Sequence, residues 1–294
     1  MGYGSYSYTA HQALTSKRAA LPTQQVFGQR GIHPKMNPFG VKVRECRDSA
    51  DHPRSLGVVF ALDVSGSMGA IPEALARKEL PTFMKTLLDA GVESPSVLIS
   101  AFTDHGSSQV PLQVGQFEAT AELMDQWLTW CFLEGGGRTP YESYELALHF
   151  FARHTAMDCW EKRGKKGYLY MTGDEPCYDV LTAAVVQKVI GSEQPVDQPV
   201  TAVIQDVKRT FHPYFLIPDP ARAARVGDFW RERLGKSYVV TLATHEDTCT
   251  VAAGLVALGE GNVKDVDELG RKLSAAGVDG AKVKRTVDAI TAVR

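Results

Sequence analysis

The chain has 294 residues, with 32 Lys and Arg against 34 Asp and Glu, and 44% of its residues are hydrophobic. This length and apolar content are enough to bury a sizeable core. A formal net charge of −2 gives no electrostatic reason to expect nucleic acid or an anionic membrane as a partner.

The first 54 residues are predicted to form an N-terminal arm that packs on the following domain, because prolines interrupt them and they lack a core of their own. Within the arm, residues 40–45 alternate like a short edge strand. No apolar signal-peptide core and no run of the ~20 apolar residues that span a bilayer is visible. Five cysteines without CxxC spacing are expected to be reduced thiols, so we expect a cytoplasmic protein.

From residue 55 onward, apolar runs typical of strands alternate with amphipathic segments typical of helices. The alternation predicts an α/β fold with a doubly wound, mostly parallel sheet and helices on both faces. Pro111 makes the third strand an edge strand, because proline is poorly tolerated in a central one. The six predicted strands cover residues 58–62, 96–103, 107–114, 167–172, 211–217 and 237–243. The predicted helices cover residues 72–90, with an interruption at Pro81, and 119–132, 141–155, 179–190, 200–209, 221–234, 248–258, 266–275 and 281–293.

The strand at 58–62 leads into a loop with oxygen donors at alternate positions. It ends in Asp63, and the glycine-containing loop that follows carries Ser65 and Ser67 before Pro72 opens a helix. Open α/β sheets place their ligands at the carboxyl ends of such strands. One carboxylate and two hydroxyls suit a small divalent cation such as Mg²⁺ as a partial ligand set. Taken alone, they also fit an ordinary helix N-terminus with a serine cap.

Two further pieces of a motif follow in order along the chain. Thr139 lies in the glycine-rich loop at 135–140, and Asp174 comes after the strand at 167–172. Together with Asp63, Ser65 and Ser67, these residues resemble the metal-ion-dependent adhesion site of von Willebrand factor A domains, over about residues 55–244. The resemblance implies that the first four oxygen donors, Asp63, Ser65, Ser67 and Thr139, ligate Mg²⁺ directly or through water, with Mn²⁺ or Ca²⁺ as alternatives. Asp174 would usually act through water.

The resemblance also implies a function. In this family the metal accepts an Asp or Glu carboxylate from a partner protein, and the short third strand is antiparallel. Residues 245–294 would supply the closing helix of the domain and a C-terminal helical extension. Soluble bacterial members resemble adaptors of MoxR-type AAA+ ATPases. We therefore expect an intracellular metal-dependent interaction module, with neither nucleic acid nor membrane as a partner.

One residue departs from the family pattern, and one unusual charge lies beside a proposed ligand. Glu175 stands where many members have a glycine after the aspartate, so it is a possible contributor to the site. Arg138 lies beside Thr139, and its guanidinium is expected either to point outward or to help hold the carboxylate of the partner.

Two other functions stay open. A metal-dependent hydrolase could use the same residues, with Asp104, His105 and Glu175 as conceivable helpers. However, no GxSxG elbow surrounds the serines and no catalytic constellation is identified. The third possibility is a structural scaffold in which the metal only stabilises the fold.

Overall fold

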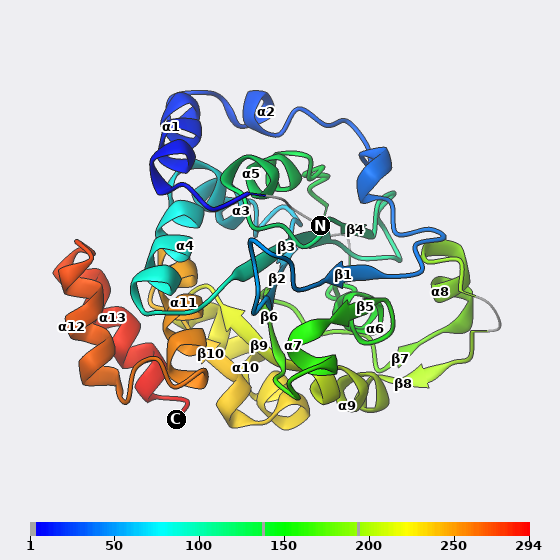
Figure 1. Cartoon of the computed structure of the whole chain (residues 1–294). Helices are drawn as coiled ribbons and strands as arrows, with labels where there is room; N and C mark the ends of the chain where they lie inside the picture. Colours follow the sequence, from blue (N-terminus) through cyan, green and yellow to red (C-terminus); the bar gives the residue numbers. More distant parts are fainter. Residues whose placement is uncertain (1–3, 137–138, 193–194) are drawn as a thin grey trace.

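The computed structural model describes residues 4–136, 139–192 and 195–294. At its centre is a six-stranded sheet in the order β10-β9-β6-β2-β3-β4, in which the β3–β4 pair is antiparallel and the other four pairs are parallel. From β2 the chain runs to the β4 edge, returns through β6 and continues to the β10 edge (Figure 1). The strands are β2 (Leu56–Asp63), β3 (Pro95–Phe102), β4 (Leu112–Val114), β6 (Gly167–Thr172), β9 (Phe211–Ile217) and β10 (Val239–Thr241).

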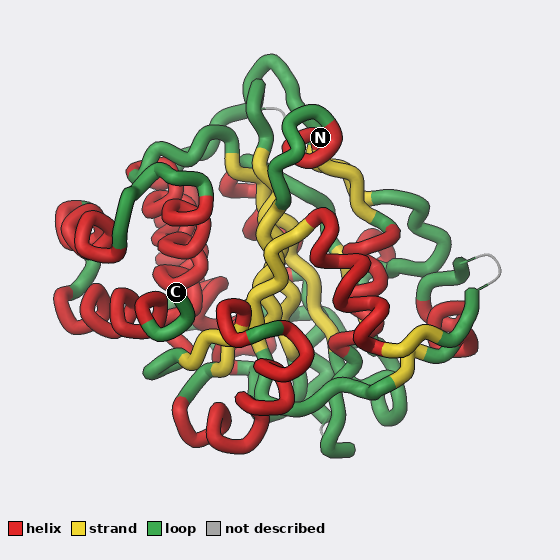
Figure 2. The backbone as a smooth tube through the Cα atoms, turned by 90° about the horizontal axis from the view of Figure 1, so that it is seen from below, coloured by secondary structure: helices red, strands yellow, loops and turns green. Residues whose placement is uncertain are grey.

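Helices cover both faces of this sheet (Figure 2). Every residue of β2 and β3 is buried, as expected for parallel strands enclosed between two helical layers. One layer contains α4 (Leu80–Asp89), α5 (Ala121–Thr129) and α11 (Thr248–Gly259). The other contains α6 (Tyr144–Arg153), α9 (Val200–Thr210) and α10 (Pro220–Leu234).

The predicted mostly parallel sheet of six strands, with a short antiparallel edge strand, is confirmed. The strands at 167–172 and 211–217 have the predicted limits, whereas the two outer strands are shorter than predicted. In β4 the pairing begins at Leu112, directly after Pro111, which has no N–H to donate to a neighbouring strand.

The long helix predicted at 72–90 is interrupted one turn earlier than expected. The short helix α3 (Ala70–Ala74) continues into a π-helical turn, η2 (Leu75–Glu79), and α4 then starts with Pro81 in its first turn. Because a first-turn residue needs no helical N–H partner, the proline fits there without breaking a hydrogen bond. The π-helical turn η2, which is wider than an α-helical turn, accommodates the shift in hydrogen-bonding pattern before Pro81.

The helix predicted at 179–190 is wrong in its first part. Residues at its start form β7 (Val180–Leu181), which pairs antiparallel with β8 (Gln198–Pro199). The helix α8 (Ala183–Val189) begins only after Thr182, whose hydroxyl accepts a hydrogen bond from the N–H of Val185. This side-chain cap sets the start of the helix.

The N-terminal arm runs over the domain, and its predicted edge strand belongs to a different sheet. The arm contains α1 (Tyr8–Arg18), α2 (Thr23–Val26), the 3₁₀ turn η1 (Pro34–Met36) and β1 (Arg44–Cys46). Instead of extending the central sheet, β1 pairs in parallel with β5 (Thr155–Met157), the segment that follows α6. Arg18 at the end of α1 pairs with Asp125 of α5, where both side chains are largely buried.

The C-terminal extension consists of α12 (Val266–Ala275) and α13 (Gly280–Thr291), as predicted apart from the ends of α13. Two ion pairs fasten α13 to the domain. Lys282 Nζ lies 2.6 Å from Glu79 Oε2, and Arg285 Nη2 lies 2.8 Å from Oδ1 of the buried Asp247. Among the described residues, no helix is both long and apolar enough to cross a bilayer.

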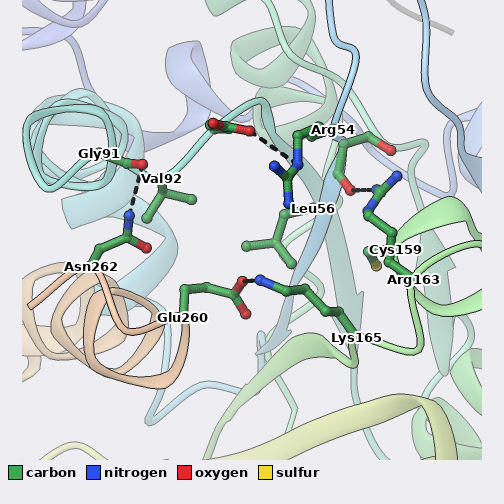
Figure 3. A pocket seen from close by; sticks show the side chains of 11 residues that line it. Arg54, Leu56, Gly91, Val92, Cys159, Arg163, Lys165, Glu260 and Asn262 are labelled. Atoms are coloured by element: carbon green, nitrogen blue, oxygen red, sulfur yellow. Dashed lines mark hydrogen bonds and ion pairs between the residues drawn. The ribbon is translucent and has the colours of Figure 1, made fainter.

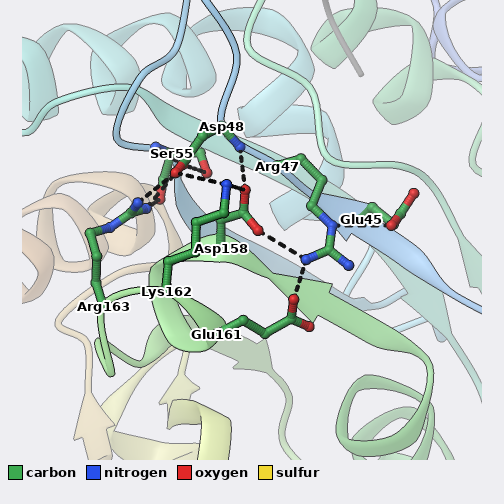
Figure 4. A network of polar contacts seen from close by, with 8 residues as sticks. All are labelled: Glu45, Arg47, Asp48, Ser55, Asp158, Glu161, Lys162 and Arg163. Carbon is green, nitrogen blue, oxygen red and sulfur yellow. Dashed lines mark hydrogen bonds and ion pairs between the residues drawn. The ribbon is translucent and has the colours of Figure 1, made fainter.

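A polar network ties the end of the arm to α7 (Asp158–Glu161) and to the residues after it (Figure 4). The Asp48 carboxylate accepts hydrogen bonds of 2.7 and 3.1 Å from Arg163, and of 3.0 and 2.8 Å from the N–H and hydroxyl of Ser55. Asp158 in turn accepts from the N–H of Asp48 at 2.8 Å and from Arg47 at 2.9 Å. Although partial burial raises it, these bonds hold the pKa of Asp48 well below its usual range.

Asp48→Asn is expected to destabilise the protein by about 2 kcal/mol at neutral pH, because it removes charge-assisted hydrogen bonds. The pKa of Asp48 is lower in the folded than in the unfolded protein, so its stabilisation is present above a pH of about 4 and is lost as the pH falls further. Urea unfolding between pH 7 and pH 2 measures this. Asp228→Asn, at a fully exposed position, serves as the control. A gap between wild type and Asp48→Asn that persists undiminished in acid would contradict the assignment.

Candidate functional site

The candidate site begins at the last residue of the central strand β2. Asp63 is fully buried, and its Oδ1 accepts a hydrogen bond of 2.8 Å from the N–H of Ser65. Its Oδ2 accepts a hydrogen bond of 3.2 Å from the hydroxyl of Tyr144 at the start of α6. The Asp63 carboxylate is therefore held by the loop after β2 and by the start of α6.

The structure brings the first and last parts of the motif together. Asp174 follows β6, which pairs in parallel with β2, so both loops leave the sheet at the same edge. The Ser67 hydroxyl lies 3.3 and 3.2 Å from the two carboxylate oxygens of Asp174. Asp174 is buried, whereas Ser67 is exposed and opens the site to solvent.

Thr139 contacts a different carboxylate. Its hydroxyl donates a hydrogen bond of 2.9 Å to Oδ2 of Asp104, which follows β3. Oδ1 of Asp104 accepts from the hydroxyl of Tyr178 at 2.7 Å and from the N–H of Gly106 at 2.9 Å. Asp104, named above only as a conceivable helper of a hydrolase, is here the hydrogen-bond partner of Thr139. The structure gives no direct bond from Thr139 to the Ser67–Asp174 pair among the residues it describes.

The glycine-rich loop passes directly beside the loop after β2. A Cβ atom added at Gly66 would lie 3.3 Å from the carbonyl oxygen of Gly136. The expected orientation of Arg138 lies outside the described residues, as does the third glycine of this loop.

Sequence reasoning missed Glu142, which lies among these loops. It is 2% exposed, and within the described part of the chain its Oε2 has no hydrogen-bond partner. Burial raises the pKa of its carboxyl, and so do the negative charges of Asp63, Asp104 and Asp174. Nothing in the sequence around residue 142 distinguishes it from an exposed glutamate near the start of a helix.

Burial and a neighbouring negative charge also affect the pKa of Asp63. Burial raises its pKa, and the charge of Asp174 adds to this effect against the hydrogen bonds from Ser65 and Tyr144. A divalent cation would relieve this repulsion, and carboxylate and hydroxyl oxygens are the donors that Mg²⁺, Mn²⁺ and Ca²⁺ accept. Within the described ranges, no group of three or more His, Cys, Asp or Glu side chains is already arranged to hold a metal ion. The residues therefore fit a cation by donor chemistry, with two carboxylates and hydroxyls as its candidate ligands.

An arginine that the motif does not include flanks the site. Arg222 of α10 donates a hydrogen bond of 3.1 Å to the carbonyl oxygen of Ser67, and its Nε lies 3.5 Å from Oδ2 of Asp174. The side chain of Glu175 pairs with Arg225 at 2.6 Å, so this possible contributor is engaged by α10. A hollow of about 160 Å³ adjoins these groups, lined in part by Ser67, Met68, Ile71, Pro218, Arg222 and His245.

Another hollow of about 160 Å³ lies at the opposite edge, beside the amino ends of β2 and β3 (Figure 3). Its cationic groups already have acidic partners. Lys165 Nζ lies 2.7 Å from Glu260 Oε2, and Arg54 Nε lies 3.2 Å from Glu93 Oε2. Because these charges are paired within the chain, we place the candidate function at the carboxyl edge.

No protein-family model matches the chain, and no curated protein matches it. Similar solved structures include the pilus adhesin SpaC of Lactobacillus rhamnosus GG, at 13% identity and a TM-score of 0.46, over 71% of this chain and 30% of the adhesin. The open conformation of the same adhesin gives 12% identity and a TM-score of 0.46, over 74% and 30%. Proximal thread matrix protein 1 of the mussel byssus gives 13% and 0.43, over 74% and 49%. This chain thus spans less than a third of the length of the adhesin.

Proposed function

We propose that this chain is a von Willebrand factor A domain protein whose loops at the carboxyl edge of the sheet bind a divalent cation and present it to an acidic residue of a partner protein. Mg²⁺ is the proposed cation, with Mn²⁺ or Ca²⁺ as alternatives. The observation that carries the proposal is the contact between Ser67 and Asp174, which joins two parts of the motif that lie 107 residues apart in the chain.

The hydrogen bonds of the hydroxyl groups suit this role. Ser67 donates its proton to Asp174, and Thr139 donates its proton to Asp104. A hydroxyl that donates to a carboxylate keeps its oxygen lone pairs for a cation, and the carboxylate behind it fixes its orientation. Asp63, Ser65, Ser67 and Thr139 would hold the cation, with Asp174 acting through water. Since most of these ligands are neutral, the cation would keep enough charge to attract an external carboxylate.

The partner is part of the proposal too. The resemblance to bacterial adaptors favours a MoxR-type AAA+ ATPase as the machine with which this chain works, in the cytoplasm. At the rim of the site, Arg222 lies against Asp174 and Asp219, so it would orient the Asp174 carboxylate beside the cation.

Asp63→Asn is expected to weaken Mg²⁺ and Mn²⁺ binding at least about 100-fold, because it replaces the one buried carboxylate of the first loop by a neutral group of the same shape. Isothermal titration calorimetry of wild type and variant measures this, with the exposed Asp228→Asn as the control. Stability in EDTA should not fall, since the buried charge is removed along with its repulsion of Asp174.

A capture experiment then separates the functions. Acidic partners retained by wild type with Mg²⁺, but not with EDTA or by Asp63→Asn, would support an interaction module. If wild type bound no divalent cation at millimolar concentration, the proposal would fall. Cation binding that raised thermal stability without retaining any partner would support a structural scaffold instead.

A further inference from the structure

The unpaired oxygen of Glu142 is the feature of this edge that the motif leaves unexplained. The side chain is 2% exposed, yet its Oε2 has no hydrogen-bond partner among the residues that the structure describes, which do not include 137–138. Buried polar atoms are nearly always paired, because an unpaired one loses its hydration without compensation. Two neighbouring acidic residues do have cationic partners, since Asp174 and Glu175 each lie against an arginine of α10.

The backbone holds Glu142 between the two arms of the motif. Its N–H donates a hydrogen bond of 3.1 Å to the carbonyl oxygen of Pro176, in the loop that carries Asp174. Two residues further on, Tyr144 donates its hydroxyl proton to Asp63. Glu142 is therefore anchored beside the Asp174 loop and directly before the residue that positions Asp63.

The position of Glu142 between the loops, beyond its missing partner, separates it from Glu145, which is also buried and unpaired in the described part of the chain but whose Oε1 lies 3.7 Å from Nδ1 of His105. A buried carboxyl that stabilised the fold would use both oxygens in hydrogen bonds or ion pairs, as Asp48 does with Arg163 and Ser55. Burial raises the pKa of the Glu142 carboxyl, and the negative charges of Asp63, Asp104 and Asp174 raise it further. A cation between them would turn this repulsion into attraction and would favour the ionised form of the carboxyl.

We propose that Glu142 is an additional ligand of the cation at this site, directly or through one water, so that three carboxylates of this chain serve it instead of two. The inference rests on the proposed function, since it concerns the same cation. Its consequence is that the chain holds its cation tightly without a partner, and that the incoming carboxylate of a partner competes with Glu142 for the metal.

The test is calorimetric titration of the full chain with Mg²⁺ and Mn²⁺, for wild type, Glu142→Gln, Asp63→Asn and Glu145→Gln. Glu145 is a matched control, because it lies three residues further along, is fully buried and has no hydrogen-bond partner for either oxygen among the described residues. We expect Glu142→Gln to bind both cations at least tenfold more weakly than wild type, and Glu145→Gln to stay within twofold. Thermal unfolding in EDTA checks that each variant is folded, and Glu142→Met repeats the test should the amide variant fold poorly.

Each result has a distinct meaning. Weakened binding by Asp63→Asn together with wild-type binding by Glu142→Gln would overturn the inference and leave the proposed function standing. A wild type that binds neither cation would remove both. Equal losses in Glu142→Gln and Glu145→Gln would assign the effect to burial of charge near the loops and would also overturn the role of Glu142 as a ligand.

Discussion

Gly173→Ala is expected to destabilise the protein by roughly 3 kcal/mol or more and to disorganise the candidate site. Gly173 separates β6 from Asp174, and an added Cβ would lie 1.9 Å from the hydroxyl oxygen of Tyr144 and 2.6 Å from two of its ring carbons. Contacts this short cannot persist, so either the ring or the strand end has to move.

Tyr144 has no room to move away. Its ring is fully buried and packs edge to face on Phe102, Phe215 and Trp230, at centroid distances of 4.8, 5.2 and 5.0 Å. Its hydroxyl is also the partner of Asp63, so displacement of the ring would release the buried carboxylate. Native interiors are packed closely enough that such strain spreads to the neighbouring side chains.

The matched control for this variant is Gly69→Ala, in the loop after β2. Gly69 has a φ of −57°, and an added Cβ there would meet no atom of the described residues within 4 Å. We expect a change within about 0.5 kcal/mol, because the alanine fits and slightly restricts the unfolded chain. Urea unfolding measures both variants, and near-ultraviolet circular dichroism reports on Tyr144 and Trp230. If Gly173→Ala proved as stable as Gly69→Ala, the tight packing of Tyr144 would be refuted.

Glu145→Gln is expected to stabilise the protein, and by an amount that grows as the pH rises from about 4.5 to about 8. Glu145 lies in the first turn of α6 and is fully buried, and in the described ranges neither carboxyl oxygen has a hydrogen-bond partner. Burial raises its pKa to about 8. The groups that face it are Asp104, whose charge adds to this rise, His105, whose Nδ1 lies 3.7 Å from Oε1, and the buried thiol of Cys177.

The direction of this pH dependence follows from the pKa of Glu145 in the folded and in the unfolded protein. Because the pKa of Glu145 is higher in the folded than in the unfolded protein, its contribution to stability is fully present below the unfolded pKa of about 4.5. That contribution is lost as the pH rises through the folded pKa, with a total on the order of 4 kcal/mol. Glutamine does not ionise, so the variant avoids this loss.

Urea unfolding at several pH values between 4.5 and 8.5 measures the expected divergence of wild type and Glu145→Gln. Glu122→Gln, at an exposed position of α5, should show no such divergence. A difference that stayed constant across this range would mean that ionisation of Glu145 has no part in it.

The order of strands and helices followed from the sequence because its signals are local. Apolar runs such as those at 167–172 and 211–217 end at prolines, glycines or charges, and these set the strand limits without reference to the rest of the chain. The pairing of β1 with β5 joins segments that are distant in sequence, and the sequence predicted no partner for β1. The residues of β7 were wrongly predicted as the start of a helix, because the pairing of β7 with β8 is not visible in the local pattern.

In the candidate site, too, some features were determined by the sequence and others only by the tertiary structure. Sequence by itself placed Asp63, Ser65 and Ser67 in one loop, because they lie within five residues of each other at the end of a buried strand. It also placed Asp174 at the same edge, because parallel strands bring their carboxyl ends together. The burial of Glu142 and the approach of Arg222 were decided only by the tertiary structure. Both depend on how α6 and α10 pack against loops that are distant in sequence. No local sequence pattern indicates which side chain near the start of a helix becomes buried.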